Sequence, residues 1–190
     1  FYRRLTKGEA GKGITVLMRY TLRMLTAQQY ERAASLICEC DLLRRQENIP
    51  GGEISIGLWV GSEVTPNHVV SDNPDLESAE SILNKLQSGF VDEVKSSPVQ
   101  LSTCPYCGEV LEPQNAYNIQ KRHFKTHCPN PACPFHEDLP VVTVDDDIYD
   151  RKPTLLIGTI DKFARLAWEE KTKSIFAEDG IGFPPDLLIQ

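Results

Sequence analysis

The spacing of four cysteines constrains this chain more than any other feature. Cys104 and Cys107 form a C-x2-C pair followed by glycine, and Cys128 and Cys133 form a second pair with four intervening residues. A C-x2-C turn directs two thiolates at one ion, and four thiolates satisfy the tetrahedral preference of Zn²⁺. The pattern therefore predicts a zinc ribbon over residues 101–137, with these four cysteines as ligands.

Two alternatives concern the ligand set. Two disulfides would suit an oxidising compartment, but the chain has no secretory signal and is long enough to bury a core without them. Any of His123, His127 and His136 could replace a cysteine, although we expect these histidines to be exposed or to serve packing. A site of four cysteines has no open coordination position, so we expect the zinc to be structural.

The other two cysteines, Cys38 and Cys40, lie in a helical pattern. A C-x-C spacing cannot place both side chains on one face of a helix. We expect both to be buried small apolar residues.

Composition limits the partners of the chain. The 190 residues are 41% hydrophobic and 25% charged, with 27 acidic and 20 basic side chains and a net charge of −7. This balance excludes a polycation that coats nucleic acid, so any nucleic-acid contact must be local. Neither a signal peptide nor a membrane-spanning run is visible. We expect a soluble, cytoplasmic excerpt of a longer protein.

The hydrophobic pattern predicts alternating strands and helices. Strands are predicted at 14–20, 54–60, 141–144, 154–157 and 187–189, and helices at 22–45, 72–88 and 162–168. The first strand, helix and second strand predict a right-handed βαβ unit, and the last run is apolar enough for a buried strand. We therefore expect an open α/β domain interrupted by the zinc ribbon.

Two segments resemble functional sites without the required pattern. Residues 8–13 contain glycines and a lysine, but a phosphate loop needs Ser or Thr after the lysine and a preceding strand, so we expect a plain turn. Asp145, Asp146 and Asp147 suggest a metal site, but three consecutive carboxylates point in different directions. We expect a solvated turn there.

Four segments, in order, resemble motifs of superfamily 2 helicases. Residues 20–28 (YTLRMLTAQ) are similar to the Y-P-T-R-x-L-x-x-Q pattern, and Gly61-Ser62 stands where the family often has Gly-Gly or Gly-Asp. Residues 157–166 (IGTIDKFARL) are similar to G-T-P-D-K-L-x-R-L, and 185–189 resemble the strand that leads into the acidic box. The sequence of residues 17–34, together with the position of the ribbon before the third motif, is most similar to helicase subunits of DISARM antiphage systems.

The resemblance implies the first RecA-like domain of a helicase: a parallel sheet with flanking helices, built from residues 1–100 and 138–190 around the 101–137 insertion. It implies backbone contacts to nucleic acid, DNA by its class, from three strand-end turns. The residues so implied are Arg23, Gly61, Ser62, Thr159 and Lys162. The phosphate loop and the acidic box lie outside these 190 residues, so ATP and Mg²⁺ are expected only in the parent protein, together with a second RecA-like domain and defence-complex subunits.

The placement of these turns has a physical basis of its own. Ligands of open α/β sheets bind at the carboxyl ends of strands, where free N–H groups face phosphate oxygens. Departures from the family pattern stand at Thr21, Leu22 and Ile160. The alternative for Arg23 and Lys162 is that they only solvate helix starts.

A short basic stretch lies between the cysteine pairs. Lys121, Arg122 and Lys125 are interleaved with aromatic residues and have no acidic neighbours from 117 to 127. Such a pattern suits contact with a nucleic-acid backbone, and a solvated ribbon face is the alternative. The leading hypothesis is the nucleic-acid-binding portion of an ATP-dependent helicase or translocase acting in phage defence. The rival is a non-enzymatic zinc module that docks a protein partner.

Overall fold

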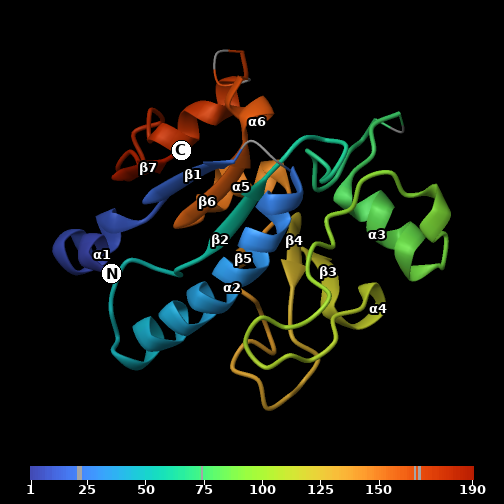
Figure 1. The fold of residues 1–190 in the computed structure, drawn as a ribbon, viewed down its shortest axis with the longest axis horizontal. Helices are drawn as coiled ribbons and strands as arrows, with labels where there is room; N and C mark the ends of the chain where they lie inside the picture. The colour runs from blue at the N-terminus through green and yellow to red at the C-terminus, as the bar shows by residue number, and fades with distance from the viewer. Residues whose placement is uncertain (21–22, 74, 165, 167) are drawn as a thin grey trace.

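The central feature of the fold, given by a computed structural model, is a five-stranded parallel sheet (Figure 1). The structure describes residues 1–20, 23–73, 75–164, 166 and 168–190, without the side chains of 23–27. The strand order is β5-β2-β6-β1-β7, and every pairing in the sheet is parallel. The strands are β1 (Val16–Tyr20), β2 (Ile56–Trp59), β5 (Val141–Val142), β6 (Leu155–Thr159) and β7 (Leu187–Ile189). The predicted α/β class is confirmed.

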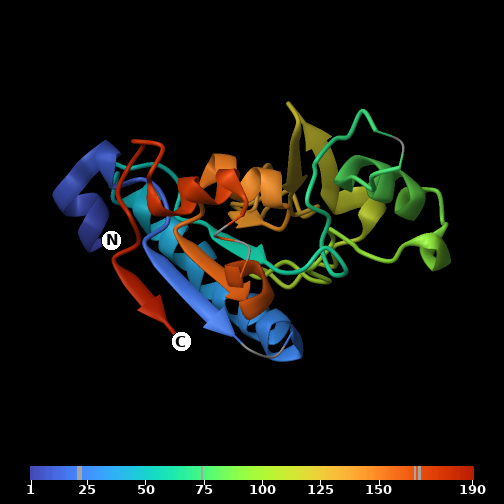
Figure 2. The ribbon, with the colours of Figure 1, turned by 90° about the horizontal axis from the view of Figure 1, so that it is seen from above.

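Helices cover both faces of this sheet (Figure 2). The long helix α2 (Arg23–Gln46) buries Tyr30, Ala34 and Cys38 against one face, in a cluster that includes alternate residues of β2. The opposite face packs against α5 (Asp145–Arg151) and the 3₁₀ segment η4 (Glu170–Phe176). Because parallel strands are apolar on both sides, the chain needs both layers to bury them.

The remaining elements lie around this sandwich. They are α1 (Tyr2–Lys7), η1 (Gly8–Gly11), α3 (Ala79–Gln87), η2 (Val91–Glu93), α4 (Pro113–Ala116), the hairpin strands β3 (Tyr117–Gln120) and β4 (His123–Thr126), and α6 (Ile160–Ala164). The glycine-rich segment 8–13 is indeed a turn, η1 with its flanks. It holds no strand-to-helix phosphate loop.

The strand ends that matter for function lie side by side. The first strand, helix and second strand form as predicted, but β6 lies between β1 and β2 in the sheet. In this register Tyr20 is opposite Thr159, and Trp59 is opposite Gly158. The carboxyl ends of β1, β6 and β2 therefore stand at one level of one edge of the sheet.

Three predictions need correction. Helix α3 begins after Ser78, whose hydroxyl oxygen accepts the Ser81 N–H at 3.3 Å, so this capping box fixes the start rather than the Asp72–Pro74 segment, of which Pro74 is outside the described residues. The strand at 187–189 forms, but it is an exposed edge strand and not a buried one. The turn expected at Asp145–Asp147 is the first turn of helix α5.

The cysteine-bearing segment packs directly on the main core. Three of its cysteines share one hydrophobic cluster with Tyr30 and Cys38 of α2 and with β2. Cys38 is fully buried as expected, whereas Cys40 is only half-buried. The segment carrying the four thiols is thus part of the same buried layer as α2.

Candidate metal centre and nucleic-acid interface

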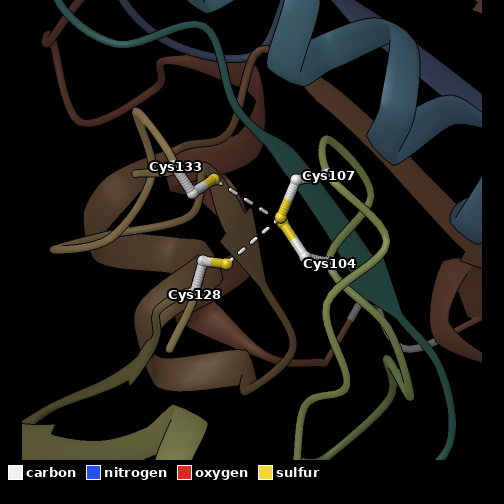
Figure 3. Close-up of side chains that lie close together, drawn as sticks. All are labelled: Cys104, Cys107, Cys128 and Cys133. Carbon is white, nitrogen blue, oxygen red and sulfur yellow. Dashed lines mark hydrogen bonds between the residues drawn. The ribbon is translucent and has the colours of Figure 1, made fainter. Parts of the chain in front are cut away.

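The four predicted ligand cysteines come together in space. Their sulfur atoms all lie within 4.8 Å of one another, and Figure 3 shows them turned toward a common centre. The Sγ atoms of Cys107 and Cys128 are 3.4 Å apart and those of Cys104 and Cys133 are 4.0 Å apart. Ligands at ~2.3 Å from a tetrahedral Zn²⁺ stand about 3.8 Å from each other. All four cysteines are free rather than disulfide-bonded, so the donor set fits one zinc ion.

The backbone around each pair keeps the thiols in place. The Cys104 N–H donates to the Glu109 carbonyl at 2.7 Å, and the Gly108 N–H donates back to the Cys104 carbonyl at 2.9 Å. Gly108 has a φ of +78°, which a glycine adopts without strain. On the second pair, the Cys128 N–H donates to the Phe135 carbonyl at 3.0 Å. Two tight turns therefore direct the sulfurs toward one centre.

Two of the three neighbouring histidines, His123 and His136, have other partners. Nδ1 of His123 lies 2.7 Å from Asp147 Oδ1, and Nδ1 of His136 lies 2.8 Å from the Cys128 carbonyl oxygen. Among the described residues, only the four cysteines form a group with metal-ligand spacing. The predicted cysteine set therefore stands without a histidine substitute.

Burial makes two of the four thiols reluctant to ionise without a cation. It raises the pKa of Cys133 to about 11 and also raises the pKa of Cys128. Only thiolates are effective zinc ligands, so loading the site at neutral pH must release protons.

A second set of contacts joins this centre to α2. Asp41, fully buried, accepts from Arg44 Nε and Arg45 Nε at 2.7 Å each and from the Ile54 N–H at 2.9 Å. The Arg45 guanidinium stands over the Phe135 ring, 4.9 Å from its centroid. Asp41 and Arg45 could not be singled out from the sequence, because nothing in it indicates which distant ring an arginine meets.

The strand-end turns expected to hold nucleic acid differ in exposure. Ser62 is exposed and Gly61 is half-buried after β2, whereas Thr159 is 1% exposed and its hydroxyl is buried with no hydrogen-bond partner among the described residues. Arg23 is the first residue of α2, but its side chain lies outside the described residues.

Lys162 has surroundings that the sequence did not suggest. Its side chain is buried, its ammonium is ion-paired with Asp145, and it donates to Asn67 Oδ1 at 3.1 Å. Burial raises the pKa of Asp145. In this arrangement the Lys162 charge faces a protein carboxylate inside the fold rather than solvent.

The other aspartates of the run are also committed to partners. Asp146 pairs with Lys171 at 2.9 Å and with His68 at 3.1 Å, and Asp147 accepts the Phe124 N–H at 2.8 Å. The three carboxylates do point in different directions, but Asp145 and Asp147 are buried. The expectation of a solvated turn was therefore wrong, because each side chain satisfies a donor from a different segment.

The basic stretch forms the tip of the β3-β4 hairpin. Lys121 and Arg122 are the two turn residues, are exposed, and have φ angles of +51° and +65°. Lys125, the third expected contact, is largely buried and ion-paired with Asp138. The hairpin therefore presents two of the three predicted cations at its tip.

Comparison with known proteins gives one informative match. The chain is 38% identical over 177 residues to the DISARM protein DrmA of Bacillus paralicheniformis, a match that covers 90% of this chain and 15% of that protein. No protein-family model matches the chain. In the part that the structure describes, no helix has the length and apolar character needed to cross a bilayer. This chain is thus similar in sequence to a DISARM protein, of which it spans a small part.

Proposed function

We propose that this relative of a DISARM protein is the strand-gripping portion of an ATP-dependent superfamily 2 helicase or translocase that acts on DNA in phage defence. Its α/β part corresponds in this proposal to a RecA-like domain, in two pieces around the zinc-bearing insertion. The sequence similarity to a DISARM protein supports the defence role. The order of the helicase-like segments along the chain supports the enzyme class.

One observation carries the proposal. The three helicase-like turns follow β1, β2 and β6, and these strands are neighbours with matched ends, since Tyr20 pairs with Thr159 and Trp59 with Gly158. Segments far apart in the sequence thus emerge together at the edge where open α/β sheets bind ligands. A row of backbone N–H groups and a hydroxyl at this edge suits a phosphate backbone and reads no bases.

The hairpin tip is a second candidate contact and carries formal charge. Lys121 and Arg122 are exposed, whereas many other cations of this acidic chain are paired with carboxylates. Two adjacent free-standing basic side chains attract phosphates without base preference. The overall charge of −7 leaves such local sites as the means of binding.

In the proposed mechanism this chain contributes the grip and not the chemistry. ATP and Mg²⁺ would be held by other parts of the parent protein, and closure against a second RecA-like domain would move the grip along the strand. The zinc would serve as a structural brace. A partner-docking role for the zinc-bearing segment is the competing outcome of the test.

Fluorescence anisotropy of the zinc-loaded chain with labelled single-stranded DNA tests the proposal. The logarithm of the binding constant should fall linearly with log[salt] from about 50 to 200 mM, as expected when phosphate contacts release counterions. Replacing Lys121 and Arg122 together by glutamine should lower affinity for every sequence alike. A matched control is Lys7→Gln, an exposed lysine of α1 away from the hairpin. Absence of binding at any salt concentration would contradict the proposal and favour a protein-docking module.

A further inference from the structure

We infer that Asp145 is a positioning residue that holds the turn after β2 and the turn after β6 at a fixed spacing, so that both engage one nucleic-acid strand. The inference rests on the proposed function and adds a residue that no helicase-like motif of the chain contains. Asp145 begins α5, a short helix that belongs to neither turn.

The first arm of the link reaches the turn after β6. Asp145 Oδ2 is ion-paired with the ammonium of Lys162, which belongs to α6, three residues past the end of β6. The same ammonium donates to Asn67 Oδ1 at 3.1 Å, in the loop that follows β2. Lys162 and Asp145 are 1% and 5% exposed. One buried cation therefore joins both turns, and Asp145 balances its charge.

The second arm reaches the end of β2 itself. The Tyr149 hydroxyl lies 3.4 Å from Asp145 Oδ2 and accepts from Trp59 Nε1 at 3.2 Å. Trp59 is the last residue of β2, two positions before Gly61. Asp145 is thus connected to the loop after β2 at two points. Tyr149 and Trp59 connect it to the start of the loop, and Lys162 connects it to Asn67 further along the loop.

Close packing between the two strand ends leaves little room for adjustment. The Trp59 ring stands 5.6 Å from the Phe163 ring of α6, centroid to centroid. A Cβ atom added at Gly158 would stand 3.1 Å from Phe163 and 3.2 Å from Trp59. The side chains of Phe163 and Trp59 therefore crowd the space beside Gly158, and the polar link fixes the orientation of the two strand ends.

The ion pair between Lys162 and Asp145 is better explained by the positions that it fixes than by a contribution to folding stability. A buried ion pair loses much of its attraction to desolvation, and apolar residues of similar volume often replace it without loss of stability. Its specific effect is to fix geometry, because a buried ammonium must meet its acceptors. Here those acceptors belong to α5 and to the loop after β2.

The test compares the salt dependence of DNA binding among variants of the zinc-loaded chain. If the two turns no longer engage together, at least one phosphate contact is lost, and the slope of log K against log[salt] for single-stranded DNA should fall in magnitude by about 0.7. At about 0.1 M salt the same loss corresponds to roughly fivefold weaker binding. The slope does not depend on how much of the sample is folded, so a merely structural role would leave it unchanged.

Two variants and one control make the test decisive. Asp145→Asn removes the charge, and the double variant Asp145→Leu with Lys162→Met replaces the pair by apolar side chains that keep the volume. The double variant keeps the net charge of the chain, so it should show the reduced slope and it decides the test, whereas Asp145→Asn alone also leaves the Lys162 charge unbalanced. Glu53→Gln breaks another partly buried ion pair, between Glu53 just before β2 and Arg151 at the end of α5. This control should keep the parental slope.

The outcomes separate the two claims. A parental slope in folded Asp145 variants, beside clear binding by the parent chain, overturns this inference and leaves the proposed function intact. Absence of salt-dependent binding in the parent chain overturns the proposed function and this inference with it.

Discussion

The guanidinium of Arg45 in α2 lies over the ring of Phe135, two residues past the zinc-ligand candidate Cys133, with 4.9 Å between the guanidinium carbon and the ring centroid. The same arginine is held from its other side by the buried carboxylate of Asp41. Phe135 in turn meets Tyr106, beside the first cysteine pair, edge to face at 5.5 Å. The last turns of α2 and both cysteine turns therefore form one packed unit.

Metal removal should therefore destabilise the whole chain and not only residues 101–137. In Cys128→Ser, or after chelation, a metal ion no longer holds together the cysteines that pack with Tyr30 and β2 in one buried cluster. We expect one cooperative unfolding transition at lower denaturant concentration, with loss of helical signal from α2, measured by circular dichroism. A local loss of the insertion with an unchanged transition for the rest would contradict the shared core.

The Arg45 contact allows a graded version of this experiment. Arg45→Ala removes a cation–π contact worth about 0.5–1 kcal/mol and a salt bridge to Asp41 while keeping all four thiols. Zinc should still bind with four-cysteine stoichiometry, and unfolding should occur at a moderately lower denaturant concentration. Glu39→Ala, at another exposed position of α2, is the control and should behave like the parent.

The two basic residues at the hairpin tip should favour DNA binding and lower the stability of the chain. Lys121 and Arg122 adopt left-handed conformations that cost about 1–2 kcal/mol per residue with L side chains, whereas Asn-Gly suits such a two-residue turn. Replacing the pair by Asn-Gly should raise the thermal midpoint and lower DNA affinity. Lys125→Ala should lower the thermal midpoint and leave DNA affinity unchanged, because that lysine is paired with Asp138 rather than presented at the tip. A more stable hairpin with undiminished binding would remove the tip from the interface.

The buried Asp147 should leave a signature in the pH dependence of stability. Burial raises its pKa above the ordinary 3.8, so the folded chain holds this proton at pH values where the unfolded chain has released it. The unfolding free energy should therefore fall as the pH rises from 3.8 through the native pKa of Asp147. Asp147→Asn should lack this contribution, measured as the difference in denaturant midpoint from the parent at each pH, which cancels effects common to both. An equal pH dependence in both proteins would contradict the assignment.

Much of the fold could be predicted from the sequence because local patterns determine it. The strands before and after α2 are apolar runs, and the cysteine pairs carry their own turn geometry. The insertion of β6 between β1 and β2 could not be predicted, because strand order depends on pairing between residues more than 90 positions apart. The same holds for the role of β7, whose apolar sequence does not reveal that it is an edge strand.

The contacts of individual charges were the least predictable part of the site. Lys162 and Lys125 look alike in sequence to Lys121, yet two of them are paired inside the structure and one is presented at a turn. Asp145–Asp147 has the composition of a solvated turn, and only the approach of α6, β4 and η4 makes each carboxylate a partner. Charge pairing of this kind depends on tertiary contacts, which a single sequence does not contain.

Hydrogen–deuterium exchange of the zinc-loaded chain, with and without single-stranded DNA, tests the central claim most directly. We predict slower exchange on DNA binding in three peptides: 60–65 after β2, 119–124 at the hairpin tip, and 157–162 after β6. Exchange in α1 and α3 should remain unchanged. Protection confined to other segments, or none at DNA concentrations that saturate binding, would contradict the claim that these turns grip the strand.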